Sequence, residues 1–337
     1  MRQVLIIGSG PAGYTAALYA ARAELKPLLI ASSVEAGGEL MNTTDVENFP
    51  GFPEGVQGPD LMDRMMEQAK RFGAEILLDD VVEVELEGDV KRVRTGSGAT
   101  FEALTVILAT GSAYRKLGIE GEDRLSGHGV SWCATCDGFF FRQKTIAVVG
   151  GGDSAMEEAT FLTRFADKVY VIHRGDSLRA SKIMQQRAFD NPKIEFVWNS
   201  TVTEVQGGDL VSGVRLASTV GEPDRELPLD GLFIAIGNDP RTELVKDVLE
   251  LTPAGTVAVE GRSSRTSLPG VVAAGDVLDP TYRQAVTAAA SGTVAALDAE
   301  HYLADLPGDL LAQAVGESAP STAPAAGTPL TPSGQLV

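Results

Sequence analysis

Cysteine and histidine are scarce in this chain, whose 337 residues include two cysteines and three histidines. A structural zinc site needs about four ligands, and His128, His173 and His301 stand apart from one another and from the cysteines, so we expect no metal. Positive charge is also in deficit, with 28 Lys and Arg against 46 Asp and Glu. Because clustered cations bind phosphate backbones, a net charge of −18 argues against nucleic acid as a partner.

Long apolar runs are missing as well. No stretch reaches the roughly 20 residues of a transmembrane helix, and the chain enters an apolar strand at Val4 with no signal-peptide pattern before it. We therefore expect a cytoplasmic protein with no membrane partner. The composition, 44% hydrophobic and 22% charged, is typical of a globular chain long enough for two domains.

The two cysteines lie three positions apart, as Cys133-Ala134-Thr135-Cys136, and Asp137 follows them. A structural disulfide in so short a loop stabilises little and is rare inside cells. Cys-x-x-Cys spacing is typical of thiols with a pKa lowered into a reactive range. We favour a redox-active pair, with zinc binding and a structural disulfide as alternatives. A carboxyl beside a dithiol can relay protons, which makes Asp137 a candidate acid–base residue.

A glycine-rich loop, Gly8-Ser9-Gly10-Pro11-Ala12-Gly13, follows an apolar strand at 4–7 and precedes an alanine-rich helical stretch at 16–23. This order of strand, loop and helix predicts a dinucleotide site. Gly8 permits the tight turn, Gly10 the approach of the pyrophosphate and Gly13 the close helix–strand contact. The acidic ribose ligand of this fingerprint is absent from 31–33, where Glu35 is only a weak candidate.

A second loop, Gly150-Gly151-Gly152-Asp153-Ser154-Ala155, follows a predicted strand at 145–149. Gly150 precedes His173 by 23 residues, and Gly8 precedes Ala31 by the same 23, which indicates an internal repeat. His173 and Arg174, with Arg179 further on, offer cations where the 2′-phosphate of NADPH would lie. Ordinary surface cations are the alternative interpretation.

Three further segments carry weaker signals. The apolar runs 106–111 and 232–237 both end in glycine, and we predict that the chain passes between domains there. A third run, 271–277, delivers Asp276 directly after Gly275. Such a carboxylate can reach a ribityl chain, with glycine allowing close backbone approach, although Gly-Asp is also common in turns.

Taken together, residues 3 to 305 resemble the low-molecular-weight thioredoxin reductases. The most specific matches are 133–138 and 150–159, supported by 46–51, 109–111, 275–277 and 282–285. The resemblance implies an α/β fold with two Rossmann-like dinucleotide-binding domains, in which an NADPH domain (117–243) is inserted into an FAD domain (1–116 and 244–305). It also implies a homodimer. Residues 306–337, rich in Pro and Ala, are expected to form a flexible tail.

The resemblance assigns roles by position. Cys136 would face the flavin, Cys133 would attack thioredoxin, and Asp137 would be the acid–base partner. The residues implied for FAD are Gly8, Gly10, Pro11, Ala12, Gly13, Gly38, Glu39, Asn48, Ala109, Thr110, Gly111, Gly275, Asp276, Arg283, Gln284 and Ala285. Those implied for NADPH are Gly150, Gly151, Gly152, Asp153, Ser154, Ala155, His173, Arg174 and Arg179.

Two positions depart from the family pattern. Gly175 stands where the family has a second arginine after the histidine, which predicts a relaxed preference for NADPH over NADH because one charged hydrogen bond is lost. Glu39 replaces the glutamine of a Gly-Gly-Gln sequence, and its carboxylate could lower the flavin's reduction potential.

The implied activity passes electrons from NADPH through FAD to the Cys133–Cys136 disulfide, and then by thiol–disulfide exchange to thioredoxin. Because the dithiol and the NADPH loop share the inserted domain, we expect that domain to rotate between the half-reactions, on hinges near 116–118 and 239–240. The alternatives are a flavin reductase acting on another disulfide partner and a redox-sensing flavoprotein without turnover.

Overall fold

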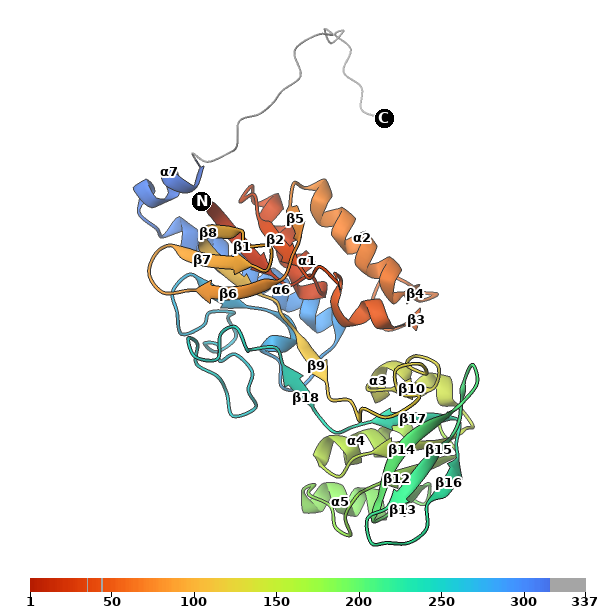
Figure 1. Cartoon of the computed structure of the whole chain (residues 1–337). Coiled ribbons are helices and arrows are strands. Elements are labelled where there is room, and N and C mark those ends of the chain that lie inside the picture. Colours follow the sequence, from red (N-terminus) through yellow and green to blue (C-terminus); the bar gives the residue numbers. More distant parts are fainter. Residues whose placement is uncertain (35, 44, 316–337) are drawn as a thin grey trace, which may run out of the picture.

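The computed structural model describes residues 1–34, 36–43 and 45–315. Within these residues the chain forms two α/β units joined by a narrow two-stranded ribbon (Figure 1). None of the helices in these ranges is long and apolar enough to cross a membrane.

The first unit is built on a seven-stranded sheet formed by both ends of the chain. Its order is β5-β2-β1-β8-β7-β6, with β19 also paired to β8. The parallel strands are β1 (Arg2–Ile7), β2 (Leu28–Ala31), β5 (Glu75–Leu78), β8 (Thr100–Leu108) and β19 (Val271–Ala273). The antiparallel edge consists of β6 (Val81–Glu85) and β7 (Lys91–Thr95).

Three helices cover one face of this sheet. They are α1 (Pro11–Arg22), α2 (Gly58–Arg71) and α6 (Ala285–Ala304). The close approach of α1 and α6 needs a glycine, because a Cβ on Gly292 would lie 2.2 Å from the carbonyl oxygen of Ala12. The other face packs against apolar side chains of the segment 244–259. Short elements at the edge of the unit are η1 (Gly38–Asn42), β3 (Asp45–Val46), β4 (Val56–Gln57) and η3 (Gly275–Val277).

The inserted unit has a five-stranded parallel sheet with the order β10-β17-β11-β12-β13. Its strands are β10 (Val130–Ser131), β11 (Thr145–Val149), β12 (Lys168–Ile172), β13 (Ile194–Val197) and β17 (Gly231–Ile234). Side chains of η2 (Gly138–Phe141), α4 (Asp153–Leu162) and α5 (Lys182–Phe189) fill one face. The other face packs against an antiparallel sheet of β14 (Ser200–Gly207), β15 (Val211–Ser218) and β16 (Arg225–Pro228).

The ribbon between the units consists of β9 (Ser112–Tyr114) and β18 (Asn238–Pro240), paired antiparallel. Each strand directly follows one of the two glycine-ended segments, so the chain passes between the units where the sequence predicted. Arg115 strengthens the ribbon by donating from Nε and Nη2 to the carboxylate of Asp239, at 3.0 and 2.6 Å.

The predicted fold class is confirmed, but the start of the tail is not. Residues Gly308–Val315 form a helix, α7, close to the N-terminus (Figure 1). Leu306, Leu311 and Ala314 pack against the core of the first unit, so apolar side chains that a flexible tail would leave in water are partly covered. Residues 316–337 of the predicted tail lie outside the described residues, as does Glu35.

Candidate active site

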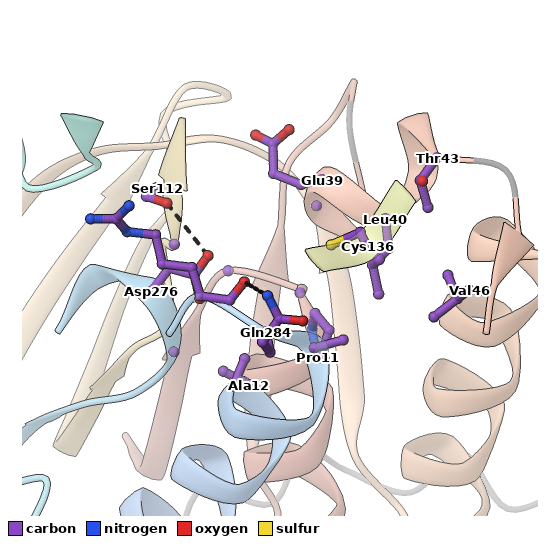
Figure 2. Close-up of a pocket in the computed structure, with 18 of the residues that line it drawn as sticks. Pro11, Ala12, Glu39, Leu40, Thr43, Val46, Ser112, Cys136, Asp276 and Gln284 are labelled. Atoms are coloured by element: carbon purple, nitrogen blue, oxygen red, sulfur yellow. Dashed lines mark hydrogen bonds between the residues drawn. The ribbon is translucent and has the colours of Figure 1, made fainter. Parts of the chain in front are cut away.

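A single cavity brings the predicted FAD residues together (Figure 2). Its walls come from the first glycine loop, from η1 and the segment after it, from the end of β8, and from the start of α6. The inserted unit contributes Cys136 and Asp137 to the same cavity. The predicted residues in its lining are Gly8, Gly10, Pro11, Ala12, Gly38, Glu39, Asn48, Ala109, Thr110, Gly111, Gly275, Asp276, Arg283, Gln284 and Ala285.

The three fingerprint glycines fit a bound pyrophosphate. A Cβ on Gly13 would lie 2.0 Å from the carbonyl oxygen of Gly8, and one on Gly8 would lie 2.2 Å from that of Ala109. Gly10, in contrast, faces open space, with no atom within 4 Å of its Cβ position. It also caps α1 without a side-chain hydrogen bond, so the first helical N–H groups are free to bind an anion. Gly13 therefore supports the loop from behind, outside the cavity lining.

Asp276 lies on the wall of this cavity. Ser112 donates a hydrogen bond to its carboxylate at 3.4 Å (Figure 2). Burial raises the pKa of Asp276 to about 6, and the nearby charge of Asp279 adds to the increase while Arg283 opposes it. A half-buried carboxylate that keeps free acceptor capacity is suited to hydroxyl donors of a ligand.

Glu39 also lines the cavity, but its charge is paired. Arg241 donates from Nη2 to the Glu39 carboxylate at 2.8 Å. The predicted effect of Glu39 on the flavin is therefore weakened by an opposite charge. Arg241 follows β18 directly, and its backbone N–H donates to the carbonyl oxygen of Gly111.

The two cysteines form a disulfide at the rim of the cavity. Cys133 caps the short helix α3 (Ala134–Asp137), and of the two cysteines only Cys136 is among the residues lining the cavity. Asp137 lies next to it, where burial raises the pKa of the carboxyl and a hydrogen bond from Ser131 opposes the increase. A raised pKa keeps more of the acid protonated near neutral pH, as proton donation requires.

The second glycine loop has the same construction as the first. A Cβ on Gly150 would lie 2.5 Å from the carbonyl oxygen of Ala235, and one on Gly151 would lie 2.3 Å from the His173 ring, whereas Gly152 faces open space. Gly152 caps α4 without a side-chain hydrogen bond. The loop, with Ser154 and Ala155 in the first turn of α4, therefore fits a second pyrophosphate.

Two side chains predicted to touch NADPH also make contacts that build this loop. The ring of His173 is buried, with Nδ1 at 3.1 Å from the carbonyl oxygen of Gly150 and Nε2 at 3.0 Å from that of Ser177. Asp153 accepts the backbone N–H of Ser181 at 2.7 Å. These contacts hold the loop in place, and contact of either side chain with NADPH stays a prediction.

Arg174 and Arg179 remain as cations for a phosphate. Both are exposed, and neither guanidinium has an ion-pair partner among the described residues. The backbone N–H groups of Arg179 and Ala180 donate to the carbonyl oxygen of Gly151 at 2.8 and 3.0 Å, which keeps this cationic segment beside the loop. Gly175 leaves room for a side chain, since its Cβ position comes no nearer than 3.4 Å to the His173 ring.

Sequence reasoning missed several residues of the first cavity. Ser9, Ser112, Tyr114 and Arg241 all line it, and Ser9 accepts the backbone N–H of Gly37 at 2.9 Å. Ser112 and Tyr114 carried one available signal, because they directly follow the glycine-ended segment at 106–111. Arg241 carried none, since only the ribbon brings it opposite Glu39.

Known proteins match this architecture. The family described as pyridine nucleotide-disulphide oxidoreductase matches residues 2–292, and the chain belongs to it. A thioredoxin reductase of Streptomyces coelicolor is 61% identical over 306 residues, covering 91% of this chain and 95% of the relative. The resemblance to low-molecular-weight thioredoxin reductases is thereby confirmed, and with it FAD and NADPH as cofactors.

Two solved structures add information on shape. A thioredoxin reductase from Streptococcus pyogenes, 46% identical, superimposes with a TM-score of 0.86 over 90% of this chain and 98% of its own. A Lactococcus lactis thioredoxin reductase described as in the FR conformation is 42% identical, yet its TM-score is 0.61 over 91% and 100% of the two chains. The two reductases are similarly identical in sequence to this chain but superimpose on it to very different extents, which indicates that the two domains are arranged differently in the second structure.

Proposed function

We propose that this enzyme reduces the disulfide of thioredoxin with electrons from NADPH. One observation carries the proposal: the Cys133–Cys136 disulfide lies at the rim of the cavity formed by the first glycine loop, with Cys136 toward that cavity. A disulfide placed there is reducible from inside the protein and, once reduced, can exchange with a partner's disulfide.

The residues of the chain divide the work. Bound FAD would supply two-electron transfer between NADPH and the disulfide, held by the first glycine loop, Asp276 and the start of α6. Arg174 and Arg179 would bind the 2′-phosphate of NADPH. Asp137 would hold the proton that is exchanged as thiol and thiolate interconvert, and Cys133 would be the thiol that attacks thioredoxin.

The inserted domain must move between the two half-reactions. In this structure the disulfide occupies the approach to the first cavity, and the second glycine loop belongs to the same unit as the disulfide. Both cannot face one flavin together. Two reductases that are similarly identical to this chain superimpose on it with TM-scores of 0.86 and 0.61. This difference supports a rotation of one unit against the other.

We place the hinges closer to the ribbon than the sequence indicated. The Glu122 carboxylate accepts the backbone N–H groups of Leu117, Gly118 and Ile119 at 2.9, 2.7 and 3.3 Å, so these three residues move with the inserted domain. The flexible point on this strand is therefore Arg115–Lys116. On the other strand it is Gly237, with a φ of 109°, directly before β18.

We propose an FAD domain of 1–116 and 244–305 around an NADPH domain of 117–243, with the second boundary moved back to 237 because β18 pairs with β9 and Arg241 bonds to Gly111. We also propose a homodimer, on the resemblance, and a cytoplasmic location, on the N-terminal sequence pattern.

The deciding experiment is oxidation of NADPH by the purified protein in the presence of thioredoxin, with NADH in parallel and Cys136→Ser as the control. Thioredoxin-dependent flux that Cys136→Ser abolishes would support the proposal. A flavin that NADPH reduces without any flux to thioredoxin would transfer the proposal to another disulfide partner.

A further inference from the structure

The two sulfurs of the disulfide have unequal surroundings. Around Cys133 Sγ lie the backbone N–H of Cys136 at 3.2 Å, Thr135 Oγ1 at 3.4 Å and Gln284 Nε2 at 4.0 Å. Among the described residues no hydrogen bond reaches Cys136 Sγ. Donors therefore gather on the sulfur that is absent from the lining of the flavin cavity.

A chain of side-chain hydrogen bonds, which we call the relay, leads from Asn48 through Gln284 and Thr135 to Cys133 Sγ. Asn48 Nδ2 donates to Gln284 Oε1 at 3.3 Å. Gln284 Nε2 lies 3.3 Å from Thr135 Oγ1 and 3.2 and 3.1 Å from the carbonyl oxygens of Tyr282 and Arg283, so these three acceptors share its two N–H groups. Because Thr135 accepts from Gln284 and a disulfide sulfur carries no hydrogen, the Thr135 hydroxyl donates to Cys133 Sγ. The side chain of Gln284 is held further by the capping box with Thr287 at the start of α6.

We propose that Thr135, oriented by Gln284, stabilises Cys133 as the leaving thiolate when the disulfide is reduced. The proposal rests on the proposed function, which supplies two electrons and one proton. The S–S bond breaks, each sulfur keeps one electron pair, Cys136 takes the proton and becomes a thiol, and Cys133 Sγ carries the negative charge. Hydrogen bonds to a charged acceptor are stronger than those to a neutral one, so Thr135 binds the product thiolate more tightly than the disulfide.

The relay crosses the boundary between the units. Thr135 and Cys136 move with Cys133, whereas Asn48 and Gln284 belong to the first unit. Gln284 therefore orients Thr135 only while the disulfide faces the cavity. Once the inserted domain turns away, the Cys133 thiolate loses this support and becomes the stronger nucleophile, because nucleophilicity of a thiolate rises with the pKa of its thiol.

The test measures the pKa of the Cys133 thiol directly, in full-length, FAD-loaded Cys136→Ser protein, from the pH dependence of alkylation by iodoacetamide. Adding Thr135→Val, which removes the hydroxyl at similar size, should raise this pKa by about one unit, as expected for loss of one hydrogen bond to a charged group. Thr135→Ser should restore the original value, and Gln284→Leu should raise it in the same direction.

The matched control is Thr203→Val, an exposed threonine of the same unit on β14 whose hydroxyl donates to the carbonyl oxygen of Arg215. It should leave the pKa of Cys133 unchanged. Retention of bound FAD and an unaltered Tm show that each variant is folded. The same pKa in Thr135→Val as in its parent, or no recovery with Thr135→Ser, overturns the inference. Alkylation needs no thioredoxin, so this outcome is separate from failure of the thioredoxin assay.

Discussion

Replacing Gly175 with arginine should restore the cation that this chain lacks at its second nucleotide loop. Gly175 lies between Arg174 and the segment that leads to Arg179, and its φ is outside the left-handed region. The nearest atom to its Cβ position is His173 Nε2 at 3.4 Å, an ordinary van der Waals contact. The backbone and the space therefore both accept a side chain here.

The size of the effect follows from the charge. One added guanidinium–phosphate hydrogen bond contributes about 1–3 kcal/mol, which corresponds to roughly 5-fold to 150-fold in binding. We expect the lower half of this range because both neighbouring arginines are exposed and water and salt screen the interaction. NADH has no 2′-phosphate, so its binding should not improve.

The assay compares kcat/KM for NADPH and for NADH in thioredoxin-dependent turnover, at two salt concentrations. Gly208→Arg serves as the control with the same change in net charge, since Gly208 is exposed, has open space at its Cβ position and lies on the β14–β15 turn. The ratio should rise in Gly175→Arg and stay constant in Gly208→Arg. An unchanged ratio in Gly175→Arg would refute the assignment of this loop to the 2′-phosphate.

Four further changes test other parts of the account. Gly13→Ala should yield protein without FAD, seen as lost flavin absorbance, because its Cβ would lie 2.0 Å from the Gly8 carbonyl oxygen. A fully loaded variant would contradict the fit of the loop. Asp137→Asn should slow turnover by about 10²-fold or more. The parent enzyme should lose activity as pH rises through the raised pKa of the Asp137 carboxyl, and the variant should lack this pH dependence. A wild-type pH profile in the variant would exclude Asp137 as the proton donor. In the FAD-free protein, the pKa of Asp276 of about 6 lies above its unfolded value, so Tm should rise as pH falls from 7 toward 4. Asp276→Asn should remove that component of the pH dependence, and an unaltered slope would contradict the burial of this charge. Truncation after Asp305 should lower Tm, measured by calorimetry, because Leu311 and Ala314 of α7 pack on the first core; an unchanged Tm would make α7 dispensable.

The backbone features of the site could be predicted from sequence because glycine and apolar patterning encode them locally. Gly8, Gly10 and Gly13 stand between a strand and a helix; a Cβ at Gly8 or Gly13 would clash with a backbone carbonyl, whereas Gly10 faces open space. The passage of the chain between the units was also readable, from two apolar runs that end in Gly111 and Gly237.

The side-chain partners were not predictable in this way. His173 and Asp153 have residue types that suit a nucleotide, and their contacts with Ser177 and Ser181 could not be foreseen from the sequence. Arg241 lies 202 positions from Glu39 in the sequence, and only the ribbon brings the two together. The helix α7 was missed because its short apolar stripe is stabilised by packing against a distant core, not by local propensity.

The β9–β18 ribbon limits the proposed rotation of the inserted unit to a few residues. Its strands stay with the first unit, since Arg241 donates its backbone N–H to Gly111 and Thr110 Oγ1 donates to the carbonyl oxygen of Arg241 at 2.7 Å. Beyond Lys116, Glu122 fixes the chain to the inserted unit. Rotation is thus confined to one or two residues on each strand. The contacts that must open are correspondingly specific: the ring of Trp132 next to Cys133 stacks on Tyr114 of the ribbon at 6.2 Å, and Gln284 reaches Thr135. The residues that hold the disulfide over the cavity therefore also determine how much free energy the inserted domain needs to rotate away from it. Reduction of Cys133 and the domain motion that follows are thus coupled through the same contacts.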